Sequence, residues 1–240
     1  MKPKVSVILP AYNEEDRISL TLQGLNRSLT EVGLPYEVII VNDGSNDSTY
    51  EVAVREAENY GGKVKVVGYG KNMGKGYALK TGFTYATGEI VIFMDSDMEI
   101  TPNQLIHYVK ALNYGDVVIA SKRHPQSYVE MPLLRKFLSC CFNLLVKLFT
   151  GLRLSDTQAG LKAVKRRALE KIFPKLTVKR FAFDVEFLVV ADLCGLKIIE
   201  LPVNLHLRRG VFSFLDVWRM FLDLMGITYR LRILKWYQYS

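Results

Sequence analysis

Residues 90–99 read IVIFMDSDME, in which five apolar residues are followed at once by acidic side chains at alternate positions, Asp95, Asp97 and Glu99. A short apolar run of this kind is typical of a strand that is buried on both faces of a parallel sheet. In an extended chain, side chains at positions i, i+2 and i+4 project to the same side. The stretch therefore predicts a buried strand whose end presents three carboxylates together.

Similar apolar runs recur on both sides of this stretch. We predict further buried strands at residues 5–9, 37–41, 64–67, 117–120 and 197–201. Between the strands of the first half lie segments with the apolar spacing of amphipathic helices, at residues 16–29, 48–60 and 77–86. This alternation of strand and helix predicts an α/β fold, with a Rossmann-like, mostly parallel sheet and helices on both faces.

Polar clusters follow three of the predicted strands, at the edge where such sheets bind ligands. Asp43 follows the second strand, and a carboxylate there can accept hydrogen bonds from both hydroxyls of a ribose; the alternative is a plain Asp-Gly-Ser turn. The oxygen ligands of Asp95, Asp97 and Glu99 suit a hard cation such as Mg²⁺ or Mn²⁺; the alternative is a solvated acidic loop.

The stretch NMGKG at residues 72–76 precedes a predicted helix and looks superficially like a phosphate-binding loop. It does not fit the P-loop pattern, because Tyr69 stands where the first glycine belongs and Gly76 follows Lys75 where Ser or Thr is required. Asn72, Lys75 and the backbone amides of this loop remain candidates to face a nucleotide at a helix amino terminus. The alternative is a flexible loop without a ligand.

The net charge of +8 is unevenly distributed along the chain. Residues 1–120 carry 11 Lys and Arg against 15 Asp and Glu, whereas residues 121–240 carry 21 against 9, so the basic excess lies in the second half. Such an excess suits nucleic acid, an anionic membrane or a phosphorylated ligand. A nucleic-acid-binding module would leave the acidic strand ends unexplained, and we therefore expect no nucleic acid partner.

Residues 131–149 and 211–239 combine apolar and aromatic side chains with Arg and Lys, as helices in a membrane interface do; the alternative is that both are core helices. The longest uncharged stretches, such as residues 137–146, have ten residues, fewer than the ~20 that span a bilayer. The amino terminus lacks the pattern of a signal peptide. We expect a cytoplasmic protein that associates peripherally, as a monotopic protein, with the cytoplasmic face of a membrane. The cysteines, Cys140, Cys141 and Cys194, are expected to be buried, without a disulfide or zinc site.

Five motifs in order, VSVILPAYNEE, VIIVNDGSNDST, NMGKGYALKTGF, GEIVIFMDSDMEITP and SDTQAGLKAV, resemble the inverting nucleotide-sugar glycosyltransferases of family 2 over residues 4–205. Within that family the chain most resembles enzymes that transfer a sugar to dolichyl or polyprenyl phosphate. SDTQAGLK and KRFAFDVEFL are similar to the glucosyltransferase branch, whereas DxDxxxxP, from Asp95 to Pro102, is similar to the mannose synthase pattern. The resemblance implies a GT-A fold over residues 1–205, with a nucleotide-binding half (1–120) and an acceptor half (121–205). Residues 206–240 would form an amphipathic membrane-interface tail of C-terminal helices.

The resemblance also implies roles for individual residues. The nucleotide sugar would contact Pro10, Tyr12, Glu14, Asp43, Asn72, Lys75 and Asp95. A Mg²⁺ or Mn²⁺ cofactor would be held by Asp95, Asp97 and Glu99, the last at a position where the family often has Gln. The acceptor phosphate would meet Arg123, Arg135, Ser139 and either Arg208 or Arg209, of which we favour Arg209. Asp97, Arg123 and Asp156 would take part in the reaction itself.

The activity that we expect is a metal-dependent, inverting transfer of a hexose from UDP-glucose or GDP-mannose to dolichyl or polyprenyl phosphate. A phosphate dianion needs no general base, so Asp156 either positions groups or acts as a base, and we favour positioning. The alternative enzyme acts on a soluble or glycan hydroxyl, for which Asp156 would be an obligatory base. A binding protein without turnover is a third hypothesis, which the presence of all three carboxylates at residues 95, 97 and 99 disfavours.

Overall fold

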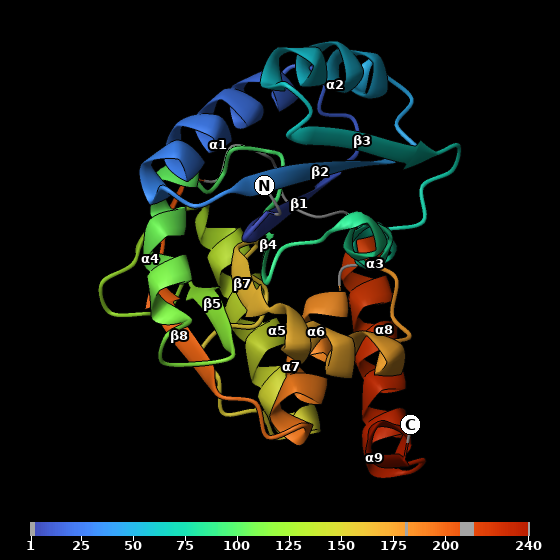
Figure 1. The fold of residues 1–240 in the computed structure, drawn as a ribbon. Helices are drawn as coiled ribbons and strands as arrows, with labels where there is room; N and C mark the ends of the chain where they lie inside the picture. Colours follow the sequence, from blue (N-terminus) through green and yellow to red (C-terminus); the bar gives the residue numbers. More distant parts are fainter. Residues whose placement is uncertain (1–2, 181, 207–213, 240) are drawn as a thin grey trace.

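The computed structural model describes residues 3–180, 182–206 and 214–239, and a seven-stranded sheet forms its centre (Figure 1). The strand order is β3-β2-β1-β4-β7-β5-β8. The strands are β1 (Val5–Ala11), β2 (Tyr36–Asp43), β3 (Val64–Tyr69), β4 (Ile90–Phe93), β5 (Val117–Ser121), β7 (Lys162–Lys165) and β8 (Ile198–Pro202). All neighbours run parallel except β7, which is antiparallel to both β4 and β5. The predicted α/β fold with a mostly parallel sheet is confirmed.

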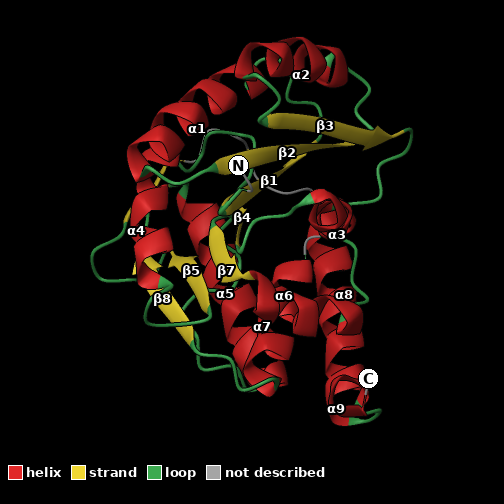
Figure 2. Ribbon diagram, in the orientation of Figure 1, coloured by secondary structure: helices red, strands yellow, loops and turns green. Residues whose placement is uncertain are grey.

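Helices cover both faces of the sheet (Figure 2). One face packs against α1 (Ile18–Val32), α2 (Thr49–Ala57) and α4 (Leu105–Ala111). The other face packs against α3 (Lys75–Tyr85), α6 (Arg166–Ile172) and α7 (Phe183–Leu193). Three further helices complete the second half of the chain: α5 (Leu133–Thr150) and α8 (Phe214–Arg232) contact each other, and α9 (Trp236–Tyr239) contacts α7 and α8. Single turns of 3-10 helix are η1 (Glu58–Tyr60), η2 (Pro102–Gln104) and η3 (Phe173–Lys175).

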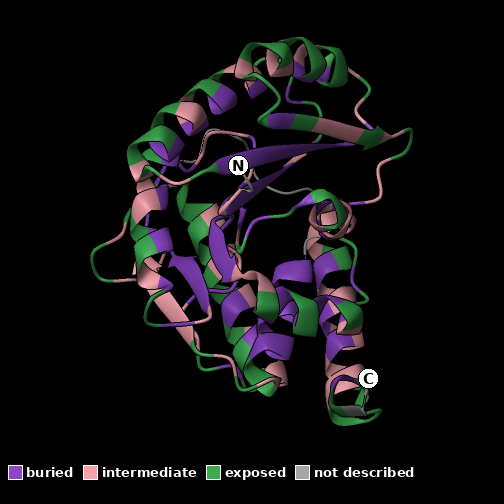
Figure 3. Cartoon of the chain, viewed as in Figure 1, coloured by how far each residue is buried: buried purple, intermediate pink, exposed green. Residues whose placement is uncertain are grey.

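The central strands are buried on both faces because their apolar side chains point alternately to one face of the sheet and to the other. In β1, Val7 and Leu9 pack under α1 and α4, whereas Ile8 points to the opposite core beneath α3. The neighbouring β2 repeats the pattern, with Ile40 on the first face and Val41 on the second. Because successive side chains of a strand point to opposite faces, an uninterrupted apolar run fits a sheet that is covered on both sides (Figure 3).

Sharp turns follow the strands at the edge where their carboxyl ends meet. Asn13, after β1, and Met98, after β4, adopt the left-handed conformation with φ of 55° and 60°. Gly44, after β2, has φ of 66°, and a Cβ there would lie 2.4 Å from the carbonyl carbon of Lys71. These turns bring the polar residues of three strand ends to one edge of the sheet, as the sequence predicts.

Three strands were missed by the sequence prediction. They are β7 and the three-residue strands β6 (Tyr128–Glu130) and β9 (Asn204–His206), which pair in parallel as a separate ribbon. The sequence of β7, KAVK, has a lysine at each end and does not look like a buried strand, yet the Lys162 side chain is 2% exposed. Its charge is neutralised by a partner that lies far along the chain.

The helices α5 and α8 each present one apolar face to solvent. The exposed apolar side chains are Leu133, Leu134, Phe137, Leu144 and Leu148 on α5, and Leu215, Trp218, Leu222 and Tyr229 on α8. The opposite sides of these helices are packed, since Val146, Leu224 and Ile227 belong to the core beneath α7. In the part of the chain that the structure describes, no helix is long and apolar enough to cross a membrane. The division at residue 205 stays a prediction, although α8 and α9 share a core with the preceding residues.

The prediction for the cysteines is wrong in one respect. All three are free, but Cys140 and Cys141 are exposed and Cys194 is only partly buried, so the expected burial is not found. Cys140 and Cys141 lie in α5, whose outer side faces solvent. Small apolar residues on such a helix are not drawn into the core.

Candidate active site

One large pocket, of about 820 Å³, opens at the carboxyl ends of β1, β2 and β4 and extends between α5 and α8. The half at the strand ends is polar, with Tyr12, Asp43, Lys75, Asp95, Asp97 and Glu99 in the wall. The half between α5 and α8 is mainly apolar, with Met131, Leu138, Phe142, Leu145, Met220 and Phe221 in the wall. A charged site and an apolar groove are thus parts of one continuous cavity.

The structure brings most of the predicted site residues together. The predicted site residues that line this pocket are Pro10, Tyr12, Glu14, Asp43, Asn72, Lys75, Asp95, Asp97, Glu99, Arg135 and Ser139. Arg123 and Asp156 are outside the lining and contact residues of the wall from behind. Arg208 and Arg209 lie outside the described residues.

Asp43 is 4% exposed and organises the loop that follows β3. Its Oδ1 accepts hydrogen bonds from the Tyr69 hydroxyl at 2.7 Å and from the Met73 amide at 2.8 Å. The Gly74 amide donates to Oδ2 at 2.9 Å and to Oδ1 at 3.2 Å. The carboxylate therefore supports the 72–76 loop, and the ribose contact predicted for it would have to use the remaining lone pairs.

The loops after β1 and β2 hold each other through side-chain hydrogen bonds. The Asn13 amide donates to Ser45 Oγ at 3.0 Å, and the Asn46 amide donates to Asn13 Oδ1 at 2.9 Å. Tyr12, with 39% of its surface exposed, projects beside them. Glu14 is buried, and its backbone amide donates to Thr49 Oγ1 at 2.7 Å. This wall is rigid, with one aromatic ring available to a planar base.

The acidic residues after β4, Asp95, Asp97 and Glu99, lie close enough together to repel one another. Burial, followed by the nearby carboxylates of Asp95 and Glu99, raises the pKa of Asp97 to about 6. Asp95 forms an ion pair with Lys75, its Oδ1 lying 2.7 Å from Nζ. Gly160 packs against Asp95 so closely that a Cβ at residue 160 would lie 1.9 Å from Oδ2. Asp95 is thus held in place from two sides.

The oxygen atoms of these carboxylates are suitable ligands for a divalent cation, but the side chains are not already arranged around a metal position. Among the residues that the structure describes, no three His, Cys, Asp or Glu side chains are arranged to hold a metal ion. The predicted set of Asp95, Asp97 and Glu99 is therefore not arranged as a metal site here, and Asp95 pairs with Lys75. Carboxylate oxygens remain the ligands that Mg²⁺ and Mn²⁺ prefer, and both ions are commonly completed by substrate phosphates and water. The repulsion at Asp97 is what such a cation would relieve.

A chain of buried charges leads from Asp95 into the core, and the sequence prediction missed its inner members. Lys75 Nζ lies 3.4 Å from Asp184 Oδ2, and Lys162 Nζ lies 2.7 Å from Asp184 Oδ1. Burial would lower the pKa of Lys75, but Asp184 and Asp95 outweigh it and the pKa is raised. Lys162 and Lys75 hold the pKa of Asp184 below its ordinary value against the effect of burial. The available signal was Asp184 within the apolar run FAFDVEFLVV, since a charge that folds into a core needs a partner.

On the acceptor side, Asp156 is 2% exposed and joins two segments of the chain. Its Oδ2 accepts a hydrogen bond from the Lys122 amide at 2.9 Å, and its Oδ1 lies 3.4 Å from Arg123 Nη1. Arg123 Nη2 in turn donates to the carbonyl and hydroxyl oxygens of Ser139, at 2.7 and 3.1 Å. Burial would raise the pKa of Asp156, but Lys122, the Gln158 amide and Arg123 together keep it below its ordinary value.

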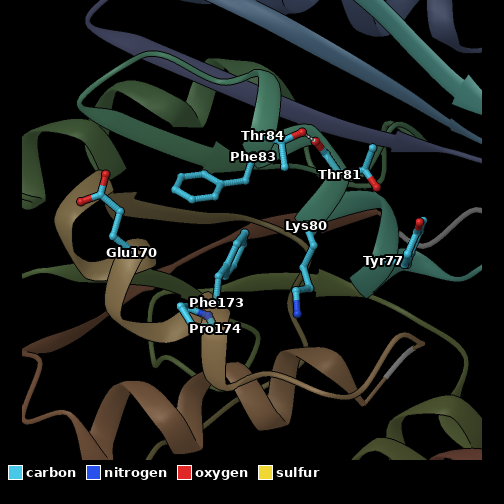
Figure 4. A pocket seen from close by; sticks show the side chains of 8 residues that line it. All are labelled: Tyr77, Lys80, Thr81, Phe83, Thr84, Glu170, Phe173 and Pro174. Atoms are coloured by element: carbon cyan, nitrogen blue, oxygen red, sulfur yellow. Dashed lines mark hydrogen bonds between the residues drawn. The ribbon is translucent and has the colours of Figure 1, made fainter. Parts of the chain in front are cut away.

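A second, shallow pocket of about 550 Å³ lies between α3 on one side and α6 with η3 on the other (Figure 4). Phe83 and Phe173 face each other there edge to face, with ring centroids 4.8 Å apart. The Lys80 ammonium group is engaged by the backbone, because its Nζ donates to the Leu176 carbonyl at 2.9 Å. None of the residues around this pocket belongs to the predicted site.

Comparison with known proteins shows the family to which the chain belongs. Residues 6–173 match the model of glycosyl transferase family 2. The chain belongs to this family and is a glycosyltransferase. It is 33% identical to a dolichyl-phosphate beta-glucosyltransferase of Trichomonas vaginalis, over 97% of this chain and 75% of that protein. It is 32% identical to the human dolichyl-phosphate beta-glucosyltransferase, over 84% of this chain and 67% of that protein.

Solved structures share the fold of this glycosyltransferase. Glucosyl-3-phosphoglycerate synthase of Mycobacterium tuberculosis, crystallised with Mn²⁺, UDP and glucosyl-3-phosphoglycerate, superimposes with a TM-score of 0.71 and 18% identity. The alignment covers 95% of this chain and 79% of that one. Mannosyl-3-phosphoglycerate synthase of Rubrobacter xylanophilus gives a TM-score of 0.69 at 19% identity, over 95% of this chain and 74% of that one. The predicted GT-A fold is confirmed.

Proposed function

We propose that this glycosyltransferase transfers glucose from UDP-glucose to dolichyl phosphate or a related polyprenyl phosphate, with inversion at the anomeric carbon and with Mg²⁺ or Mn²⁺ as cofactor. The observation that carries the proposal is the division of one pocket into a carboxylate-rich half and an apolar half. A nucleotide sugar suits the first half and a phosphate on a hydrocarbon chain suits the second. The names of the relatives favour glucose and dolichyl phosphate.

The donor half would bind UDP-glucose through the strand-end loops. Tyr12 offers a ring for the base, and the 72–76 loop, held by Asp43, presents Lys75 at the amino terminus of α3. Backbone amides and the positive end of a helix favour phosphate groups. Asp97 with Asp95 would hold the divalent cation, which supplies positive charge to the departing diphosphate.

The acceptor half would bind the lipid phosphate between α5 and the loop after β5. Arg135, Ser139 and Lys122 face the pocket, where guanidinium and ammonium groups attract a phosphate dianion. Arg123 supports Ser139 from behind the wall. A phosphate oxygen would then displace the nucleoside diphosphate directly, with a new bond to the anomeric carbon and inversion of its configuration. Asp156, ionised and held by three groups, would position the loop and take no proton.

The apolar faces of α5 and α8 suit contact with a membrane surface. Exposed Phe137 and Leu144 stand on α5 with Lys136 and Lys147 also exposed, an arrangement that places hydrocarbon and cations on one side of the protein. Amphipathic helices of this composition bind at the interface of anionic bilayers. Peripheral contact at the cytoplasmic face would bring the pocket mouth to the lipid.

The test is transfer of label into lipid. The protein is incubated in detergent with Mn²⁺, dolichyl phosphate and radiolabelled UDP-glucose, with radiolabelled GDP-mannose in a parallel arm, and the lipid is extracted into organic solvent. We expect label in the lipid from UDP-glucose, and its loss on chelation with EDTA followed by recovery on addition of Mn²⁺ or Mg²⁺. Label from GDP-mannose alone would refute the donor, and label in neither extract would refute the acceptor class.

A further inference from the structure

Four charged side chains form a continuous line from the core of the sheet to the wall of the large pocket. Lys162 on β7 pairs with Asp184 on α7 at 2.7 Å, and Asp184 pairs with Lys75 at 3.4 Å. Lys75 then pairs with Asp95 at 2.7 Å. Two cations alternate with two carboxylates, so the line is neutral as a whole and ends at the position proposed for the donor.

The inner two members are the most deeply buried. Lys162 is 2% exposed and Asp184 is 4% exposed. Lys162 also donates to the Ala159 carbonyl at 2.8 Å. A buried charge is retained only where it is paired, and removal of one partner leaves the other uncompensated. Asp184 therefore depends on its two lysines, one for each carboxylate oxygen.

The backbone around Lys75 is fitted to the segment that carries Asp184. The Tyr77 amide donates to the Lys179 carbonyl at 3.2 Å. A Cβ at Gly74 would lie 2.6 Å from that carbonyl oxygen, and a Cβ at Gly76 would lie 2.5 Å from the Phe183 ring. Both glycines are thus needed for close contact. The loop cannot shift relative to α7 without loss of this packing.

We infer that Asp184 and Lys162 are positioning residues for Lys75, and that they hold its ammonium group in the pocket wall as the binding group for the donor's diphosphate. This inference rests on the proposed function. Lys162 occupies one oxygen of Asp184, so Asp184 restrains Lys75 through the other oxygen only, and the ammonium also reaches Asp95. Without Lys162, the whole charge of Asp184 would draw Lys75 away from the pocket.

The inference is tested by nucleotide binding without turnover. UDP is titrated calorimetrically into the protein with Mn²⁺ and no acceptor, with GDP in parallel, and the nucleotide that binds the native protein more tightly is used for all variants. We expect Lys75→Met to weaken binding about tenfold or more, as loss of a charge-assisted contact does. Asp184→Asn and Lys162→Met should weaken it in the same direction. The double variant Lys75→Met with Asp184→Asn should bind within about twofold of Lys75→Met alone, because residues that act through one group are not additive.

Two controls separate positioning from general damage. Asp116→Asn makes the same chemical change in a carboxylate that pairs with Lys165 and Arg167, just before β5 at its amino-terminal end, and should leave binding unchanged. The nucleoside of the nucleotide used, uridine for UDP or guanosine for GDP, lacks the diphosphate and should give the same saturation-transfer NMR signal with every variant.

Losses that multiply in the double variant would overturn the inference, as would an equal loss for the matching nucleoside. If Asp184→Asn does not fold, Lys162→Met carries the same comparison, and unchanged binding in Lys162→Met would refute the role of Lys162. A normal set of binding results without label in lipid would refute the proposed function alone.

Discussion

Tyr237→Phe removes one buried hydroxyl that connects the end of the chain to the core. Tyr237 is 2% exposed, and its hydroxyl donates to Glu186 Oε1 at 2.6 Å. Arg230 Nε donates to the same hydroxyl at 3.0 Å. Glu186, which is fully buried, also accepts hydrogen bonds from the backbone amides of Thr177 and Val178. The change deletes two hydrogen bonds and leaves no cavity of note, because the ring is kept.

The expected magnitude follows from that geometry. A hydrogen bond to a charged group contributes about 1.5–3 kcal/mol, and Glu186 keeps its other donors, so we expect a loss of about 2 kcal/mol in the free energy of unfolding. For a chain of this size, this lowers Tm by roughly 4–8 °C. Met220 and Phe221 of α8 form part of the apolar pocket wall. We therefore also expect Tyr237→Phe to raise the KM for the lipid acceptor more than it raises the KM for the donor.

The assay is scanning calorimetry on the native protein and two variants. Tyr229→Phe serves as the matched control, because Tyr229 lies on α8 with 54% of its surface exposed, and its loss of a hydroxyl should change stability by no more than about 0.5 kcal/mol. Equal melting of Tyr237→Phe and the native protein would refute the reasoning, since it would mean that the end of the chain does not dock on Glu186.

Three further predictions concern the pocket, its wall and its outer face. Gly160→Ala places a Cβ 1.9 Å from Asp95 Oδ2 and should lower donor affinity about tenfold or more. The control Gly70→Ala, whose Cβ meets no atom within 4 Å, should leave donor affinity unchanged. Normal affinity of Gly160→Ala in a UDP titration would contradict the contact. Phe137→Glu removes an exposed ring from α5 and should reduce co-sedimentation with anionic vesicles about tenfold or more. The control Tyr114→Glu, at another exposed ring, should bind vesicles as the native protein does. Equal binding of both variants would exclude α5 from the membrane contact. Asp156→Asn should lower the transfer rate by a similar factor at every pH from about 6 to 8, because the pKa of Asp156 lies below its usual 3.8 and the carboxylate stays ionised throughout. The stabilisation by that carboxylate is present above pH 3.8 and is lost as the pH falls further, so acid titration of unfolding should affect the native protein more than Asp156→Asn; a rate loss confined to low pH would instead indicate proton transfer.

The strands that the sequence predicts are those whose burial is written in consecutive apolar residues. Residues 90–94 form such a run, and β4 follows it to within one residue. The clustering of Asp43 with Asp97 at one sheet edge was predictable for the same reason, because parallel strands end together. Local pattern is sufficient where each residue's environment depends on the periodicity of its own segment.

Residues whose environment depends on a distant partner were not predictable in this way. Lys162 is buried only because Asp184, 22 residues further along, supplies the opposite charge. Arg123 and Asp156 are not among the residues that line the pocket, and they pair with each other across 33 positions of the chain, which no local pattern indicates. Likewise, the pairing of Lys75 with Asp95 alters the predicted metal site, and no spacing along the chain indicates it.

Helix α5 borders both the apolar half of the pocket and the outer surface of the protein. Phe142 and Leu145 line the cavity, and Phe137 and Leu148 on the same helix are exposed. With the proposed acceptor, the phosphate and the first carbon units would lie in the pocket, while the rest of the hydrocarbon would stay among the membrane lipids. In that arrangement the protein has no means to measure the length of the chain. Selectivity would rest on the head group and the adjoining units, and a single enzyme of this design would serve a pool of lipids of mixed length.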